Sequence, residues 1–141
     1  MLNFEAFSGK QVVEDFELFE KMKRVALSHD LTCVLSFVDE QSDVNCYYKD
    51  DEMVGFSFMT ILEQEHIAEL CWFVIDKNKQ KINSKWFLDK TLEYMKSKEV
   101  KSVKFNCDLK SWGNIGDKYK LFKRFGYNLS SDEFWDMSIE I

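Results

Sequence analysis

The 141-residue chain predicts a single α+β domain over residues 1–141, in which helices cover both faces of a central mixed sheet of six or seven strands. Three observations predict this class. Residues 67–75 form a nearly continuous apolar run, typical of a central strand covered on both faces. An amphipathic helix pattern follows at 84–97, and an alternating strand pattern at 103–107. A strand, a helix and a strand in this order indicate a parallel pair joined by a crossover.

The N-terminal third predicts one strand and one long helix. Residues 2–6 alternate between apolar and polar side chains, as in a short strand. Over residues 10–28 the apolar side chains recur at helical spacing, with acids early and bases late. Residues 30–42 fit either a further strand or a short second helix, and the pattern leaves both open.

The middle of the chain predicts an antiparallel meander. Strand patterns at 45–48, 53–62 and 67–75 are joined by short acidic turns. A polar loop over residues 76–81 then leads to the second helix, for which Asn83 or Ser84 is the cap.

The C-terminal segment predicts a short helix and a last strand. The helix carries Tyr119, Phe122 and Phe125, and Gly126 follows in the position that favours a left-handed cap. Residues 135–141 alternate strictly between apolar and polar side chains, which is typical of a strand.

Charge is distributed unevenly along the chain. The net charge of −6 argues against a general nucleic-acid binder. Residues 76–104 nevertheless contain nine lysines and four acidic residues, a local charge of +5, so the rest of the chain carries −11. Two interpretations stay open: a solvated lysine face, or a local site for an anionic ligand on an acidic body.

Cysteine and histidine usage predicts an intracellular, cytoplasmic protein without a metal site. The four cysteines are far apart and form no CxxC pair, which is typical of reduced thiols. Only two histidines are present, so a zinc site of the His/Cys type is not expected. No segment approaches the roughly 20 apolar residues of a membrane span, and no membrane association is expected.

The order of elements, together with the motif Phe122-Lys123-Arg124-Phe125-Gly126-Tyr127, resembles the GNAT superfamily of acyl-CoA N-acyltransferases. The similarity covers most of the chain and is strongest from Met53 to Ile141. It implies a GNAT-like domain that transfers an acyl group from acetyl-CoA, or another acyl-CoA, to a primary amine. Direct attack of the amine on the thioester, in a ternary complex, is the implied mechanism.

The resemblance implies two groups of cofactor-binding residues. The strand residues Phe73, Val74 and Ile75 would offer backbone groups to the thioester. The loop that follows would cradle the pyrophosphate of coenzyme A with its backbone N–H groups and the helix N-terminus; it comprises Gln80, Lys81, Ile82, Asn83, Ser84 and Lys85.

The same loop departs from the family pattern. Gln80 fits, but Asn83 and Lys85 stand where the family has small residues. A Cβ at these positions limits close approach, although asparagine tolerates a positive φ better than most residues. The lysines of the loop have two interpretations: they offset the weaker amide contacts with charge, or they keep a vacated loop soluble.

The implied catalytic residues are less complete. Phe122 stands where the family often has a tyrosine that protonates the departing thiolate. Tyr119 lies one turn earlier, about 5–6 Å away between β-carbons, and is the candidate replacement or a packing tyrosine. Glu69 is the candidate base if its carboxylate is buried in the apolar strand; its alternative is an outward-facing or paired side chain. Asn106 and Asp108 would line the substrate cleft or simply face solvent.

Two functions of different class stay open. The first is acyl transfer to a small-molecule or protein amine, for which a cationic acceptor suits the acidic body. The second is a catalytically degenerate GNAT-fold protein that acts by binding a protein partner. Such a protein could be phage-encoded, as a virion, assembly or host-directed factor in the virion or the infected-cell cytoplasm. A homodimer is compatible with either, because the aromatic surplus leaves room for an interface.

Overall fold

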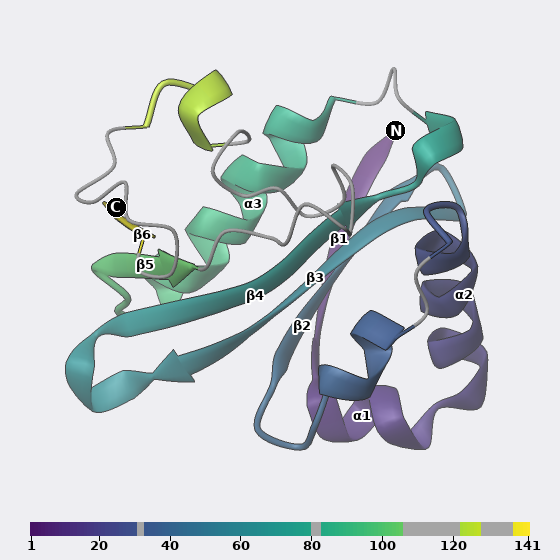
Figure 1. Ribbon diagram of the computed structural model, residues 1–141, viewed down its shortest axis with the longest axis horizontal. Coiled ribbons are helices and arrows are strands. Elements are labelled where there is room, and N and C mark those ends of the chain that lie inside the picture. The colour runs from purple at the N-terminus through teal and green to yellow at the C-terminus, as the bar shows by residue number, and fades with distance from the viewer. Residues whose placement is uncertain (31–32, 80–82, 106–121, 128–136) are drawn as a thin grey trace.

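The computed structural model describes residues 1–30, 33–79, 83–105, 122–127 and 137–141 (Figure 1). These residues contain a six-stranded sheet in the order β1-β2-β3-β4-β5-β6. Every neighbouring pair is antiparallel except β4 and β5, which are parallel. The strands are β1 (Leu2–Ser8), β2 (Asp43–Lys49), β3 (Glu52–Leu62), β4 (Ile67–Ile75), β5 (Ser102–Phe105) and β6 (Met137–Glu140). The predicted mixed sheet and its parallel pair are confirmed.

Helices cover both faces of the sheet, as predicted. The helices α1 (Gly9–Glu14) and α2 (Phe16–Leu27) pack on one face, and α3 (Ser84–Ser97) packs on the other (Figure 1). Three short 3-10 helices join the larger elements: η1 (Cys33–Phe37), η2 (Glu63–Glu65) and η3 (Lys77–Lys79). None of the helices in the described ranges is long and apolar enough to cross a membrane.

The prediction of one helix over residues 10–28 is wrong in its continuity. Asp15 has an extended backbone (φ −103°, ψ 96°), ends α1 and caps α2. Its carboxylate accepts a hydrogen bond from the backbone N–H of Leu18 at 3.0 Å. A short acidic side chain can satisfy backbone donors in this way, and it thereby stabilises a break inside a continuous apolar stripe.

The ambiguous segment at 30–42 contains the 3-10 helix η1 (Cys33–Phe37) and a turn, so the alternative of a further strand is wrong. Ser42 fixes this turn, because its carbonyl accepts a hydrogen bond from the N–H of Gly9 at 2.7 Å. Gly9 must be a glycine here, since a Cβ would overlap the backbone of Asp39. The turn therefore holds the start of α1 against the sheet.

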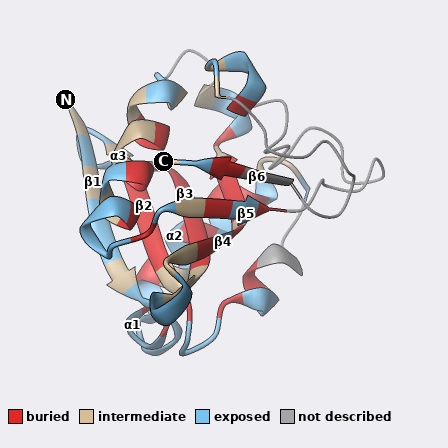
Figure 2. Cartoon of the chain, turned by 90° about the vertical axis from the view of Figure 1, so that its left-hand side faces the viewer, coloured by how far each residue is buried: buried red, intermediate tan, exposed pale blue. Residues whose placement is uncertain are grey.

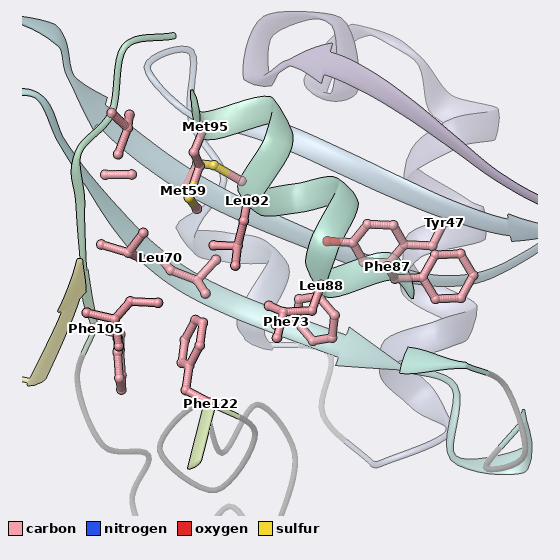
Figure 3. Packing of buried hydrophobic residues seen from close by; sticks show 14 of the residues in the cluster. Tyr47, Met59, Leu70, Phe73, Phe87, Leu88, Leu92, Met95, Phe105 and Phe122 are labelled. Atoms are coloured by element: carbon pink, nitrogen blue, oxygen red, sulfur yellow. The ribbon is translucent and has the colours of Figure 1, made fainter. Parts of the chain in front are cut away.

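The core consists of two clusters, one on each face of the sheet. Figure 2 shows the buried residues concentrated in the central strands and on the inner sides of the helices. The cluster beneath α3 includes Phe73 of β4, Phe87 and Leu88 of α3, and Phe105 of β5 (Figure 3). Phe122 joins it from the C-terminal segment, with its ring 4.8 Å from that of Phe105.

The end of the C-terminal helix has the predicted left-handed cap. Gly126 has φ +85°. The N–H of Tyr127 donates to the carbonyl of Phe122 at 3.0 Å, and the N–H of Gly126 donates to that of Lys123 at 3.1 Å. These two bonds form a Schellman motif, which the Tyr127 ring completes by packing edge-on against Phe122.

Candidate functional site

The candidate site lies where β4 continues beyond its pairing with β5. Among the described residues, the two strands pair at Ile67–Ser102, Ala68–Val103 and Glu69–Lys104. The strand β4 then runs on to Ile75, whereas the described part of β5 ends at Phe105 (Figure 1). Residues 70–75 of β4 therefore have no partner on this side among the residues that the structure describes.

A β-bulge in β4 follows directly after its last pair with β5. Leu70 pairs with Met59 of β3, but Trp72 pairs with Phe58, so Cys71 is an extra residue in β4. A bulge bends its strand and increases the local twist. The bulge thus marks the point beyond which β4 has no partner in the described part of β5.

The register with β3 determines which backbone groups face the open edge of β4. The N–H of Asp76 donates to the carbonyl of Val54 at 2.8 Å, which marks a hydrogen-bonded pair. Because such pairs alternate in an antiparallel ladder, Val74 also bonds to β3, whereas Phe73 and Ile75 do not. The N–H and C=O groups of Phe73 and Ile75 therefore point towards the open edge.

Two residues at the end of α2 bind the end of β4. The carbonyl oxygen of Ile75 accepts a hydrogen bond from Nε2 of His29 at 2.7 Å. The N–H of Lys77 donates to Oγ of Ser28 at 3.0 Å. Sequence reasoning missed His29, because the contact joins residues that are 46 positions apart. The one feature of the sequence that could have indicated His29 as a site residue is its position directly after the predicted helix.

A charge network anchors the same corner. Asp76, which is buried, lies 3.5 Å from Nη1 of Arg24, and the same nitrogen lies 3.5 Å from Glu52. Nη2 of Arg24 donates to the carbonyl of Met53 at 2.8 Å. Lys79 pairs with Glu52 at 3.4 Å. The start of the lysine-rich loop is thus bound to α2 and to β3.

The N-terminus of α3 points to the same end of the sheet. Asn83 caps it, as predicted, and its side-chain oxygen accepts from the N–H of Trp86 at 3.2 Å. Its φ of −72° is an ordinary value, so the positive φ considered for this position is absent. The cap occupies one of the N–H groups that would otherwise face an anion.

The loop lysines are partly neutralised within the protein. Lys85 lies 2.9 Å from a carboxylate oxygen of Asp89, and this hydrogen bond raises its pKa. Lys79 is paired with Glu52 at 3.4 Å. Because each of these two lysines is paired with a carboxylate, its positive charge attracts a bound anion less strongly than that of an unpaired lysine would.

Phe122 is completely buried, between the rings of Phe105 and Tyr127. Burial raises the pKa of the Tyr127 hydroxyl, with a smaller contribution from the nearby carboxylate of Asp89. Phe122 has no hydroxyl, so it cannot donate a proton at the open edge of β4.

The remaining predicted site residues lie outside the described part of the chain: Gln80, Lys81, Ile82, Asn106, Asp108 and Tyr119.

Of the two alternatives for Glu69, the structure agrees with the outward-facing side chain and not with the buried carboxylate. Its side chain is exposed on β4, where Glu69 pairs with Thr60 on one side and Lys104 on the other. Its neighbours Ala68 and Leu70 are buried beneath α3, so Glu69 points to the opposite face of the sheet. The helices α1 and α2 do not cover that face at Glu69, because the side chain is exposed. Glu69 forms the last pair between β4 and the described part of β5. Its role as a base stays a prediction.

Comparison with solved structures identifies the fold. The chain matches the PaiA N-acetyltransferase of Thermoplasma acidophilum in complex with coenzyme A (TM-score 0.62, 13% identity, 99% of this chain and 98% of that one). It matches Tetrahymena GCN5 with a TM-score of 0.70 and 12% identity, over 99% of this chain and 96% of that one. It matches the ribosomal-protein-S18-alanine N-acetyltransferase of Escherichia coli with a TM-score of 0.66 and 10% identity, over 99% of this chain and 91% of that one. No family model and no curated protein matches by sequence. The chain therefore has the fold of the GNAT N-acyltransferases.

Proposed function

We propose that this protein binds acetyl-CoA, or a related acyl-CoA, along the open edge of β4 and transfers the acyl group to a primary amine. The observation that carries the proposal is the register at the end of β4. Phe73 and Ile75 turn their backbone groups away from β3, in a part of β4 that has no partner in the described part of β5. An extended pantetheine arm can bond to such an edge as an added strand would.

The N-terminus of α3 supplies the second half of the site. The first N–H groups of a helix and the positive end of its dipole bind phosphate. Ser84 and Lys85 begin α3 directly after the Asn83 cap, and Ser84 is nine positions after the end of β4. A pyrophosphate bound there would leave the pantetheine arm to run back along Phe73 and Ile75.

The acceptor is a small-molecule or protein amine. The structural neighbours include acetyltransferases, one of them in complex with coenzyme A. Acyl transfer to an amine needs no metal, and it depends on positioning the nitrogen against the thioester carbon. The net charge of −6 favours encounter with a cationic acceptor.

A second function is favoured by three features of the same site. Phe122 offers no proton, the Asn83 cap occupies a helix N–H group, and two loop lysines are paired internally. A GNAT-fold protein that has lost catalysis and binds a protein partner would show the same features. The two functions differ in whether the protein binds acetyl-CoA.

A thermal-shift titration with acetyl-CoA and CoA separates them. Ligand at 100 times Kd stabilises the folded state by about 2.7 kcal/mol. For a domain of this size the unfolding temperature should rise by roughly 5–15 °C. Absence of a shift at millimolar ligand would refute acyl-CoA binding and leave the protein-binding function.

A pair of variants controls for charge. Ser84→Asp adds a carboxylate to the first turn of α3, where it stabilises the helix but repels a pyrophosphate. Ser97→Asp adds the same charge at the last residue of the helix, about 20 Å away. The first variant should lose the acetyl-CoA shift, whereas the second should keep it.

A further inference from the structure

We propose that His29 is the catalytic base, which accepts the proton of the attacking amine. The inference rests on the proposed acyl transfer and adds a residue to it. His29 follows α2 and reaches the open edge of β4, where its Nε2 lies 2.7 Å from the carbonyl oxygen of Ile75. No other imidazole lies at this end of β4, since His66 precedes the opposite end of the strand.

The hydrogen bond fixes the tautomer of the ring. A carbonyl oxygen can only accept, so Nε2 must carry the hydrogen. In the neutral imidazole the other nitrogen, Nδ1, then has a free lone pair. No hydrogen bond to Nδ1 is present within the described residues, whereas Nδ1 of His66 lies 3.0 Å from the carbonyl oxygen of Glu99. Each histidine thus keeps one basic nitrogen without a hydrogen bond among the described residues, Nδ1 in His29 and Nε2 in His66, but only His29 lies at the open edge of β4.

The position of His29 follows from the strand register. The Ile75 carbonyl faces the open edge because Ile75 is not bonded to β3. Two residues of a strand span about 6.6 Å, so Phe73 lies that far from Ile75 along the same edge. An imidazole held at Ile75 is within reach, directly or through one water, of an amine that approaches a group bound at Phe73.

The surroundings are compatible with a change of charge on the ring. His29 is half-buried, so its nitrogen is shielded but can exchange protons with solvent. The charged residues next to this contact along the chain are Arg24 on α2, Asp30 after His29, and Asp76 and Lys77 after Ile75. Arg24 lies 3.5 Å from both Asp76 and Glu52, and Lys79 lies 3.4 Å from Glu52, so this network pairs its charges internally. Asp30 and Lys77 carry opposite charges.

The proton transfer balances as follows. Nδ1 takes a proton from the ammonium form of the acceptor and becomes part of an imidazolium. The freed nitrogen lone pair forms the new C–N bond to the thioester carbon, and the C–S bond breaks with its electron pair on sulfur. The attacking nitrogen still carries one proton more than an amide, and this proton passes to the thiolate directly or through water. The imidazolium releases its own proton to solvent, so that amide, thiol, neutral imidazole and one free proton result.

His29→Gln separates the chemical role from the structural one. The glutamine Nε2 can still donate to the Ile75 carbonyl, but the side chain has no basic nitrogen. With spermidine as acceptor, CoA release should fall about 100-fold or more, while the acetyl-CoA shift is unchanged. In the unaltered protein the rate of CoA release should fall as acid protonates Nδ1, and in His29→Gln this fall should be absent. Unchanged turnover and an unchanged pH profile would overturn the proposal.

Histidine NMR decides the inference even if spermidine is not acetylated. With only two histidines, the labelled ring nitrogens give two sets of signals, and His66 is the internal control. Nε2 of His29 should be protonated and Nδ1 free, and acetyl-CoA should shift the His29 signals but not those of His66. A protonated Nδ1, or unchanged His29 signals under a clear thermal shift, would overturn the inference. Absence of any thermal shift would instead refute the proposed function.

Discussion

The side-chain oxygen of Asn83 accepts a hydrogen bond from the backbone N–H of Trp86 at 3.2 Å. This bond stabilises the start of α3 but uses an N–H group that could bind an anion. Asn83→Gly should therefore bind acetyl-CoA more tightly, since it frees that donor and removes a Cβ. The free energy of unfolding should fall by only about 0.3 kcal/mol. Isothermal titration and urea unfolding measure the two effects.

Asn83→Ala is the matched control for this prediction. It loses the cap, at a cost of about 0.5–2 kcal/mol, but keeps the Cβ that limits approach to the loop. Affinity should rise less than in Asn83→Gly. Weaker binding of acetyl-CoA by the glycine variant would show that the cap itself orders the binding loop.

Gly55→Ala should strain the end of β4. A Cβ at Gly55 would lie 2.6 Å from the carbonyl oxygen of Val74 and 2.7 Å from Cδ1 of Ile75. Overpacking of this kind costs about 1–3 kcal/mol, and displacement of β4 should also weaken acetyl-CoA binding. Gly126→Ala provides a comparison. Apart from its chain neighbours, the added Cβ would have no described heavy atom within 4 Å, but the φ of +85° causes backbone strain. Equal acetyl-CoA affinity in Gly55→Ala and the parent would contradict this account.

Tyr47→Phe should make folding stability less dependent on alkaline pH. The Tyr47 hydroxyl is completely buried, and lies 2.5 Å from the hydroxyls of Ser57 and Thr91. Desolvation raises its pKa far above the ordinary value of 10, so only the unfolded chain ionises as the pH passes 10. This stability is fully present below pH 10 and falls by about 1.4 kcal/mol per pH unit above it.

Urea unfolding between neutral pH and the alkaline range checks the effect. At neutral pH the variant should be less stable by about 1–2 kcal/mol, because the buried Ser57 hydroxyl loses its partner. The difference between the two proteins should shrink above pH 10. A difference that stays constant with pH would mean that Tyr47 titrates normally in the folded state.

Phe122→Tyr should not restore an acid at the site. Phe122 is completely buried against Phe105 and Tyr127, so an added hydroxyl would enter the core instead of the open edge of β4. Burying it without a partner costs about 1–3 kcal/mol. Urea unfolding should show this loss, and CoA release should not increase. An unchanged stability with faster CoA release would place residue 122 in the site after all.

Sequence periodicity predicted the layers of the fold because apolar spacing reports which side of each element is buried. The apolar run at 67–75 and the helix at 84–97 correspond to β4 and α3 within one residue. The break at Asp15 was not predicted, because the apolar stripe continues through it. The side chain of Asp15 caps α2 and stabilises an extended backbone at this position, although the apolar spacing favours a continuous helix.

The candidate site was predictable in outline only. The end of β4 and the start of α3 followed from the order of elements, and Asn83 followed from its capping chemistry. The bulge at Cys71 exists only in the register with β3, so no local pattern marks it. The contact of His29 with Ile75 depends on how α2 packs on the sheet, which a sequence pattern does not specify.

The most direct test of the open edge is the behaviour of three successive backbone amides, followed by hydrogen exchange and ¹⁵N NMR. In the free protein the N–H of Val74 should be protected, whereas those of Phe73 and Ile75 should exchange faster. Acetyl-CoA should shift and protect Phe73 and Ile75 in preference to Val74. Full protection of all three amides without ligand, together with no response to acetyl-CoA, would contradict the account.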